Sequence, residues 1–94
     1  MKDNFLFLFG NDPNIYTIDL HSSENITQAL AQLESGLFLG FKRKQNYCRI
    51  IYGVGKGVLK KEVMQVLKNN PMIKNFCEEE GGGSCICELF VNNI

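Results

Sequence analysis

The sequence predicts an α/β chain of the α+β two-layer sandwich type, with the element order βαβαββ and a four-stranded mixed sheet beside two helices. Two segments repeat apolar residues at helical spacing, and four short segments alternate or are rich in β-branched residues. With 94 residues, 45% hydrophobic and 21% charged, the chain suits one globular domain. We expect this domain to span residues 14–91, between an N-terminal extension of residues 1–13 and a tail of residues 92–94.

The first strand and the first helix are expected between residues 15 and 41. Residues 15–21 alternate, so that Asp19 and His21 lie on the face opposite the apolar side chains. Ser22 and Ser23 offer hydroxyl groups that can cap the helix that follows. The apolar face of this helix would comprise Ile26, Ala29, Leu30, Leu33, Leu37 and Phe41.

The second half of the chain repeats this pattern and closes with a hairpin. A strand at 47–52, a glycine-rich segment at 53–57 and a helix at 58–68 precede two strands at 72–77 and 85–91. Both crossovers should be right-handed, with the first three strands parallel and the last antiparallel. The carboxyl ends of the first two strands then share one edge of the sheet, where ligands of open α/β sheets bind.

His21 is the only histidine of the chain and lies at this edge, two residues from Asp19. An exposed imidazole that titrates near neutral pH is a suitable general acid or base. Asp19 could orient the ring, hold its charge or bind a divalent cation. In the simpler interpretation, His21 only forms a hydrogen bond with the start of the first helix.

The glycine-rich segment opens the second helix at the same edge. Glycines let a backbone approach a ligand, free N–H groups at a helix start attract anions, and Lys56 adds a positive charge. The segment does not match the P-loop pattern, and Val58 occupies the third glycine position of the dinucleotide pattern. A phosphate of a polynucleotide backbone suits it better, although a plain tight turn is the alternative.

The charges of the chain are segregated, although their formal sum is zero. Residues 42–74 contain nine bases and one acid, whereas the segments on either side are acidic. Such asymmetry points to a polyanionic partner. We expect phosphates to be neutralised by Arg49 and by the basic cluster, which comprises Lys42, Arg43 and Lys44. The simpler interpretation of Lys60, Lys61 and Lys68 is a solvated helix face.

The cysteine content and the hydropathy of the chain indicate the compartment and the partners that we expect. Four cysteines without a secretory segment predict reduced thiols in a cytoplasmic protein, with Cys85 and Cys87 as core residues or exposed thiols. No apolar run approaches the ~20 residues of a membrane span, so no membrane partner is expected. No metal site is predicted and no cofactor is required by the sequence. Phe5, Phe7 and Phe9 alternate like a strand that covers the sheet edge or a partner.

Taken in order, these motifs resemble the Smr (small MutS-related) domain family over about residues 14–91. Residues 18–21 (Ile-Asp-Leu-His) resemble the family's LDLH motif, and residues 50–55 (Ile-Ile-Tyr-Gly-Val-Gly) resemble its HGxG motif. The remainder of the family's pattern is matched by three further segments: the start of the second helix, Asn70-Pro71 with Phe76, and the three glycines at 81–83. Two positions depart from the family: Ser22 replaces a glycine, and Tyr52 replaces the histidine of HGxG.

The resemblance implies a fold similar to the C-terminal domain of translation initiation factor three. It also implies binding of DNA or RNA, often with endonuclease activity that nicks DNA or cleaves messenger RNA on ribosomes. Asp19 and His21 then carry over as the catalytic pair, and Gly53 and Gly55 as the loop that holds the backbone. The chain would be a stand-alone or excised copy of a domain found at the C-terminus of longer MutS-related proteins.

Three hypotheses follow for the function. The first is an endonuclease of low sequence specificity, with His21 as general acid or base. The second is a non-catalytic module that binds nucleic acid or the ribosome, in which Tyr52 contacts a phosphate or stacks on a base. The third is a protein-interaction domain that docks through Phe5, Phe7 and Phe9.

Overall fold

The structure is a computed structural model that describes residues 5–55 and 57–90 of the chain. It contains a four-stranded sheet formed by β1 (Tyr16–Asp19), β2 (Tyr47–Ile51), β3 (Ile73–Glu78) and β4 (Ser84–Leu89). Two α-helices, α1 (Ile26–Lys42) and α2 (Val58–Asn69), follow β1 and β2. The predicted α+β order βαβαββ is therefore confirmed.

The strands lie in the order β1-β2-β4-β3. β1 pairs with β2 in parallel, and β4 lies antiparallel between β2 and β3. The first three strands thus point in one direction and the last in the other, as predicted. The carboxyl ends of β1, β2 and β3 consequently lie at one edge of the sheet, which we call the carboxyl edge.

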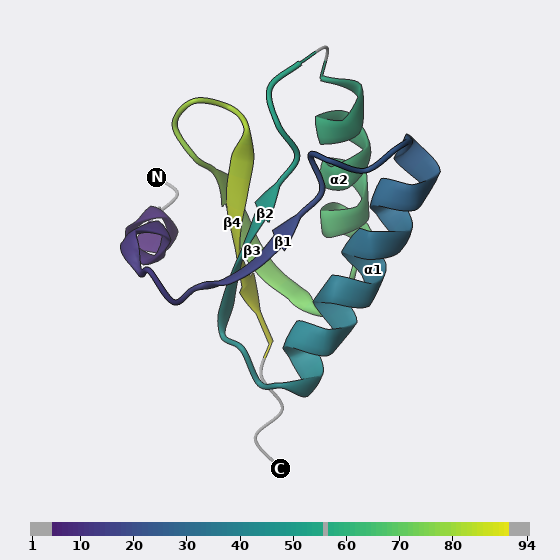
Figure 1. The fold of residues 1–94 in the computed structure, drawn as a ribbon. Helices are drawn as coiled ribbons and strands as arrows, with labels where there is room; N and C mark the ends of the chain where they lie inside the picture. The colour runs from purple at the N-terminus through teal and green to yellow at the C-terminus, as the bar shows by residue number, and fades with distance from the viewer. Residues whose placement is uncertain (1–4, 56, 91–94) are drawn as a thin grey trace.

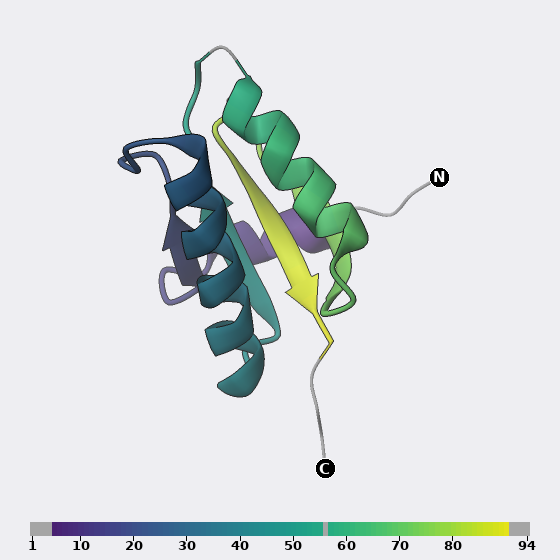
Figure 2. The same ribbon diagram turned by 90° about the vertical axis from the view of Figure 1, so that its right-hand side faces the viewer.

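Both helices cover the same face of the sheet, as Figures 1 and 2 show. Alternation along the strands sends Ile18, Ile50 and Cys87 toward this helical layer, where they form one buried cluster with Leu33 and Val63. Cys48 and Cys85 also lie in this cluster, so the core alternative predicted for the hairpin cysteines is confirmed.

Two glycines let α1 lie close to β1. A Cβ added at Gly36 would lie 2.8 Å from the side chain of Ile18, and one at Gly40 would lie 2.8 Å from the ring of Tyr16. The hydroxyl of Tyr16 also donates a 2.7 Å hydrogen bond to the carbonyl of Gly36. The helix continues through both glycines to Lys42 because these contacts outweigh their low helix propensity.

The N-cap of α1 is Asn25, so the prediction of a serine cap is wrong. The Asn25 side chain accepts a 2.8 Å hydrogen bond from the backbone N–H of Gln28. Ser23 instead donates its hydroxyl to Gln32, farther along the helix. The cap thus comes two to three residues later than predicted, because Asn is also a strong capping residue.

The open face of the sheet, opposite the helices, carries an additional element. The chain at Phe5–Asn11 forms a 3-10 helix, η1, and not the strand that the alternating phenylalanines predict. The ring of Phe9 stacks on Tyr47 of β2, with centroids 3.8 Å apart. Leu6 of η1 is buried, whereas the side chains of Phe5 and Phe7 lie outside what the structure describes. Figures 1 and 2 show η1 across the sheet from the helices.

Candidate functional site

Asp19 and His21 form a hydrogen-bonded pair where β1 ends at the carboxyl edge. The Oδ1 atom of Asp19 accepts the backbone N–H of His21 at 3.1 Å and lies 2.5 Å from the Nδ1 atom of its ring. The hydrogen bonds from the His21 side chain and backbone lower the pKa of Asp19. The side chain of His21 is 59% exposed. Because Nδ1 faces the carboxylate, Nε2 is the ring nitrogen that remains for a ligand.

The glycine loop, residues 53–57, lies beside this pair. The backbone N–H groups of Tyr52 and Gly53 both donate to the carbonyl of Gly83, which ties the loop to the β3–β4 turn. Gly53 has a positive φ of 84°, and a Cβ there would lie 3.3 Å from the Cβ of His21. The structure thus brings His21 and the glycine loop together, as the parallel crossover predicts.

The far part of the loop is open to solvent. A Cβ added at Gly55 would have no atom within 4 Å. Helix α2 then starts at Val58, and its N-cap, Gly57, provides no side-chain hydrogen bond. The first N–H groups of a helix have no partner within the helix and attract anions. Lys56, predicted to contact a phosphate, lies outside the described residues.

A hollow of 450 Å³ on the open face connects His21 with the glycine loop. Its lining includes His21, Arg49, Ile51 and Gly53, and we call it the histidine hollow. The β3–β4 turn completes its wall through Glu80, Gly81, Gly83 and Ser84. This turn is not among the site residues predicted from the sequence, although β3 runs parallel to β2 and must end at the same edge.

A second hollow, of 260 Å³, lies between the glycine loop and the start of both helices. It is lined by Gly53, Val54 and Gly55, by Gly57 and Lys60 at the start of α2, and by Ile26 of α1, among others. We call it the loop hollow. It adjoins the histidine hollow because Gly53 and Val54 line both.

Arg49 lines the histidine hollow, but its charge is already paired. Its Nε and one terminal nitrogen donate to the two carboxylate oxygens of Glu79 at 2.9 and 3.0 Å. The same terminal nitrogen donates to the carbonyl of Gly10 in η1. The hydrogen bonds between Arg49 and Glu79 lower the pKa of Glu79 and raise that of Arg49. A phosphate would have to compete with Glu79 for the guanidinium predicted to neutralise it.

Tyr52 is almost completely buried, which argues against its predicted contact with a phosphate or a base, although it is among the residues that line the loop hollow. Its residue is 5% exposed, and the ring lies in the core under the helices. The hydroxyl is buried with no hydrogen-bond partner among the residues that the structure describes, and burial raises the pKa of the phenol. Alternation from Ile50, a core residue two positions earlier, could have revealed this orientation.

The basic cluster, Lys42 to Lys44, lies at the end of the sheet opposite the carboxyl edge. Both helices begin beside the glycine loop and run away from it, as Figure 1 shows. Helix α1 has 17 residues, which corresponds to ~25 Å of helix between its start and the cluster. The cluster, which we expect from the sequence to neutralise phosphates, therefore does not lie beside His21 and the glycine loop.

No three His, Cys, Asp or Glu side chains group into a metal site within residues 5–55 and 57–90. All four cysteines are free thiols. In the part of the chain that the structure describes, neither helix combines the length and the apolarity that a membrane crossing demands.

Comparison with known proteins agrees with this geometry. The family model of the Smr domain matches residues 18–88, a range that includes Asp19, His21 and the glycine loop. The search of curated proteins found no match. Among solved structures, the chain is similar to the Smr domain of Thermus thermophilus MutS2, with a TM-score of 0.74 and 19% sequence identity. The similarity covers 81% of this chain and 99% of that chain, and it confirms the fold.

Proposed function

This chain belongs to the Smr domain family, whose members bind nucleic acid and in some cases cleave it, and we propose that it is an endonuclease of low sequence specificity. The observation that carries the proposal is the exposed Asp19–His21 pair, whose His21 lines a hollow beside Gly53. A general base needs a free ring nitrogen and a group that orients the ring. Nε2 of His21 and the carboxylate of Asp19 meet these two requirements.

RNA is the substrate that this pair can cleave with the fewest additional groups. Nε2 of His21 would take the proton of a 2′-hydroxyl, whose oxygen attacks the adjacent phosphorus. The bond from phosphorus to the 5′-oxygen then breaks and leaves a 2′,3′-cyclic phosphate, and the 5′-oxygen leaves as a hydroxyl after it receives a proton from water. Backbone N–H groups of the glycine loop would bind the phosphate oxygens, with Lys56 adding charge.

DNA lacks the 2′-hydroxyl, so nicking would require water as the nucleophile. In that reaction, Asp19 could hold a divalent cation that activates the water or binds the phosphate. A chelator therefore separates the two reactions, since only cleavage that depends on a cation should stop when the cation is removed.

A non-catalytic nucleic-acid-binding module is the second candidate, and the burial of Tyr52 favours it. The family has a histidine at this position, whereas the Tyr52 ring is 5% exposed and lies in the core. If cleavage requires a second proton-transfer group from this position, the chain binds its ligand without cutting it. Phosphate binding would still use the glycine loop and would weaken with added salt.

The test is incubation of the full chain with labelled RNA and with supercoiled plasmid, with and without a chelator. We expect shortened RNA or nicked plasmid over time, and a matched binding titration with affinity that falls as salt rises. Binding without turnover would support the second candidate. No affinity for either nucleic acid would contradict both and favour a protein-interaction domain.

The free cysteines bear on the compartment in which the protein acts. Four free thiols support a reducing compartment, and we propose that the protein acts in the cytoplasm. Its ligand there could be DNA, free RNA or message on a ribosome, and the chain could act alone or as part of a longer MutS-related protein.

A further inference from the structure

The histidine hollow and the loop hollow belong to a longer path across the surface. Gly53 and Val54 line both of them, so the two are contiguous. The loop hollow borders a third hollow, of 470 Å³, because Gly57 and Lys60 line both. Three lysines of α2 line this third hollow, which we call the lysine hollow. The three hollows together run from His21 over the glycine loop to one flank of α2.

The lysine hollow is strongly basic and only partly neutralised. Lys60 forms an ion pair with Glu78 of β3. Lys61 and Lys68 pair with no carboxylate in the portion of the chain that the structure describes. They lie seven residues apart, which is ~10 Å along the helix axis. Two phosphates of one extended strand could therefore contact both lysines.

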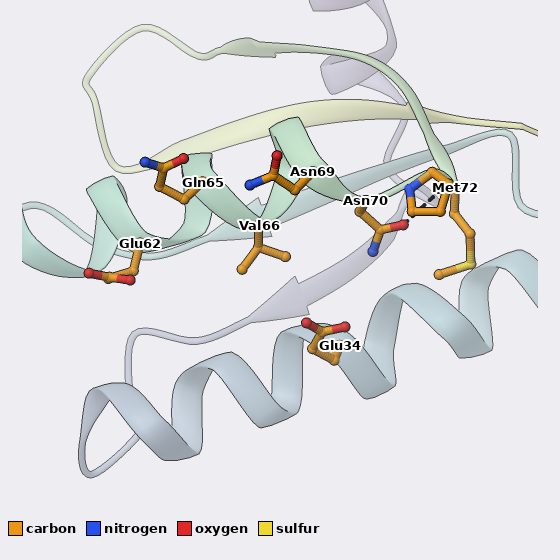
Figure 3. A pocket seen from close by; sticks show the side chains of 8 residues that line it. Glu34, Glu62, Gln65, Val66, Asn69, Asn70 and Met72 are labelled. Atoms are coloured by element: carbon orange, nitrogen blue, oxygen red, sulfur yellow. Dashed lines mark hydrogen bonds between the residues drawn. The ribbon is translucent and has the colours of Figure 1, made fainter.

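The opposite flank of α2 carries the opposite charge. A groove of 620 Å³ there is lined by Glu62 of α2, Glu34 of α1 and several amide side chains (Figure 3). Neither carboxylate has an ion-pair partner among residues 5–55 and 57–90. Phosphates are repelled from this groove and attracted to the lysine hollow, so a polyanion has one preferred flank of α2.

We propose that a single nucleic-acid strand follows this path, from His21 over the glycine loop and along Lys61 and Lys68, and that a duplex does not. The path begins on the open face of the sheet and ends in the helical layer, so it turns around the carboxyl edge. A single strand can follow that turn, whereas duplex DNA is stiff over ~150 base pairs. The inference rests on the proposed nucleic-acid function and adds the substrate class and its route.

The test compares two charge-neutralising double variants of the full chain. Lys61→Gln with Lys68→Gln removes two charges from the path, and Lys42→Gln with Arg43→Gln removes two at the far end of the sheet. Fluorescence anisotropy with a labelled single strand and with a duplex of the same length, over a range of salt, gives affinity and salt dependence. Circular dichroism checks that both variants are folded.

We expect wild type to bind the single strand more tightly than the duplex. In the path variant, the slope of log affinity against log salt should fall by about 1.4, since each phosphate contact on a single strand contributes ~0.7. This change in slope corresponds to roughly 25-fold weaker binding than wild type at 0.1 M salt. The far-end variant should keep the wild-type slope.

Each other outcome has a distinct meaning. Equal losses in both variants would show that only net charge matters and would overturn the path. Equal or tighter binding of the duplex would overturn the choice of a single strand. If wild type binds neither ligand, the proposed function itself fails, and this result is visible before any variant is compared.

Discussion

Replacement of His21 by alanine should abolish cleavage while leaving binding and folding nearly intact. The imidazole is the proposed general base, and groups in this role typically accelerate a reaction by roughly 10²–10⁴-fold. Loss of this group corresponds to ~3–5 kcal/mol of transition-state stabilisation, at ~1.36 kcal/mol per decade of rate. Phosphate contacts from the glycine loop do not involve the ring, so affinity should change little.

The same substitution should lower the free energy of unfolding much less than it raises the activation free energy of cleavage. The side chains of His21 and Asp19 are 59% and 47% exposed. An exposed pair contributes ~0.2–1 kcal/mol. Alanine also retains the backbone N–H that donates to Asp19. A loss of this size lowers the melting temperature of a domain of this length by at most ~8 °C, so the variant is folded at 25 °C.

The assay is single-turnover cleavage of a labelled strand on denaturing gels, paired with anisotropy for affinity and a thermal melt. Thr17→Ala is the matched control, because Thr17 lies on the same exposed face of β1 and its hydroxyl donates only to the nearby Ile15 carbonyl. Thr17→Ala should cut at the wild-type rate. If His21→Ala cuts as fast as Thr17→Ala, the general-base role is refuted.

Three further changes test the core, the packing and the ion pair. Tyr52→Phe removes a buried hydroxyl that has no described partner, so urea unfolding should show equal stability or a gain of ~1 kcal/mol, and a clear loss would contradict this account. Gly36→Ala would bring a Cβ within 2.8 Å of Ile18, so we expect a loss of ~1–3 kcal/mol despite better helix propensity, and a raised melting temperature would argue against it. The pKa of Glu79 is lowered by Arg49, so the pair stabilises the fold above the unfolded pKa of ~4.3 and loses this effect as pH falls through the folded value. Glu79→Gln should therefore flatten the dependence of the urea midpoint on acid pH, and an unchanged slope would contradict the ion-pair assignment.

Local periodicity in the sequence was sufficient to predict the α-helices and the strands of the sheet, but not the 3-10 helix η1. The spacing of apolar residues identified both helices and all four strands, because each pattern is set by side chains a few residues apart. The crossover rule then predicts that His21 and the glycine loop lie at one edge of the sheet. The boundaries were less accurate, since the choice of Asn25 over two serines as the cap depends on where the chain turns.

The sequence also contains signals that argue against two of the predictions. Continuing the alternation of β2 past Ile50 sends Tyr52 into the core, and counting the length of α1 puts the basic cluster at its far end. Both errors arose because residues were grouped by their distance along the chain instead of by face and by end.

Other features were decided only when the layers packed together. The insertion of β4 between β2 and β3, and the seating of η1 on the open face, depend on which surfaces bury one another. Arg49 meets Glu79, 30 residues away, and the carbonyl of Gly10, 39 residues away. No local pattern records such distant partners. Short-range spacing therefore determined what each segment became, and long-range packing determined which charges remained available to a ligand.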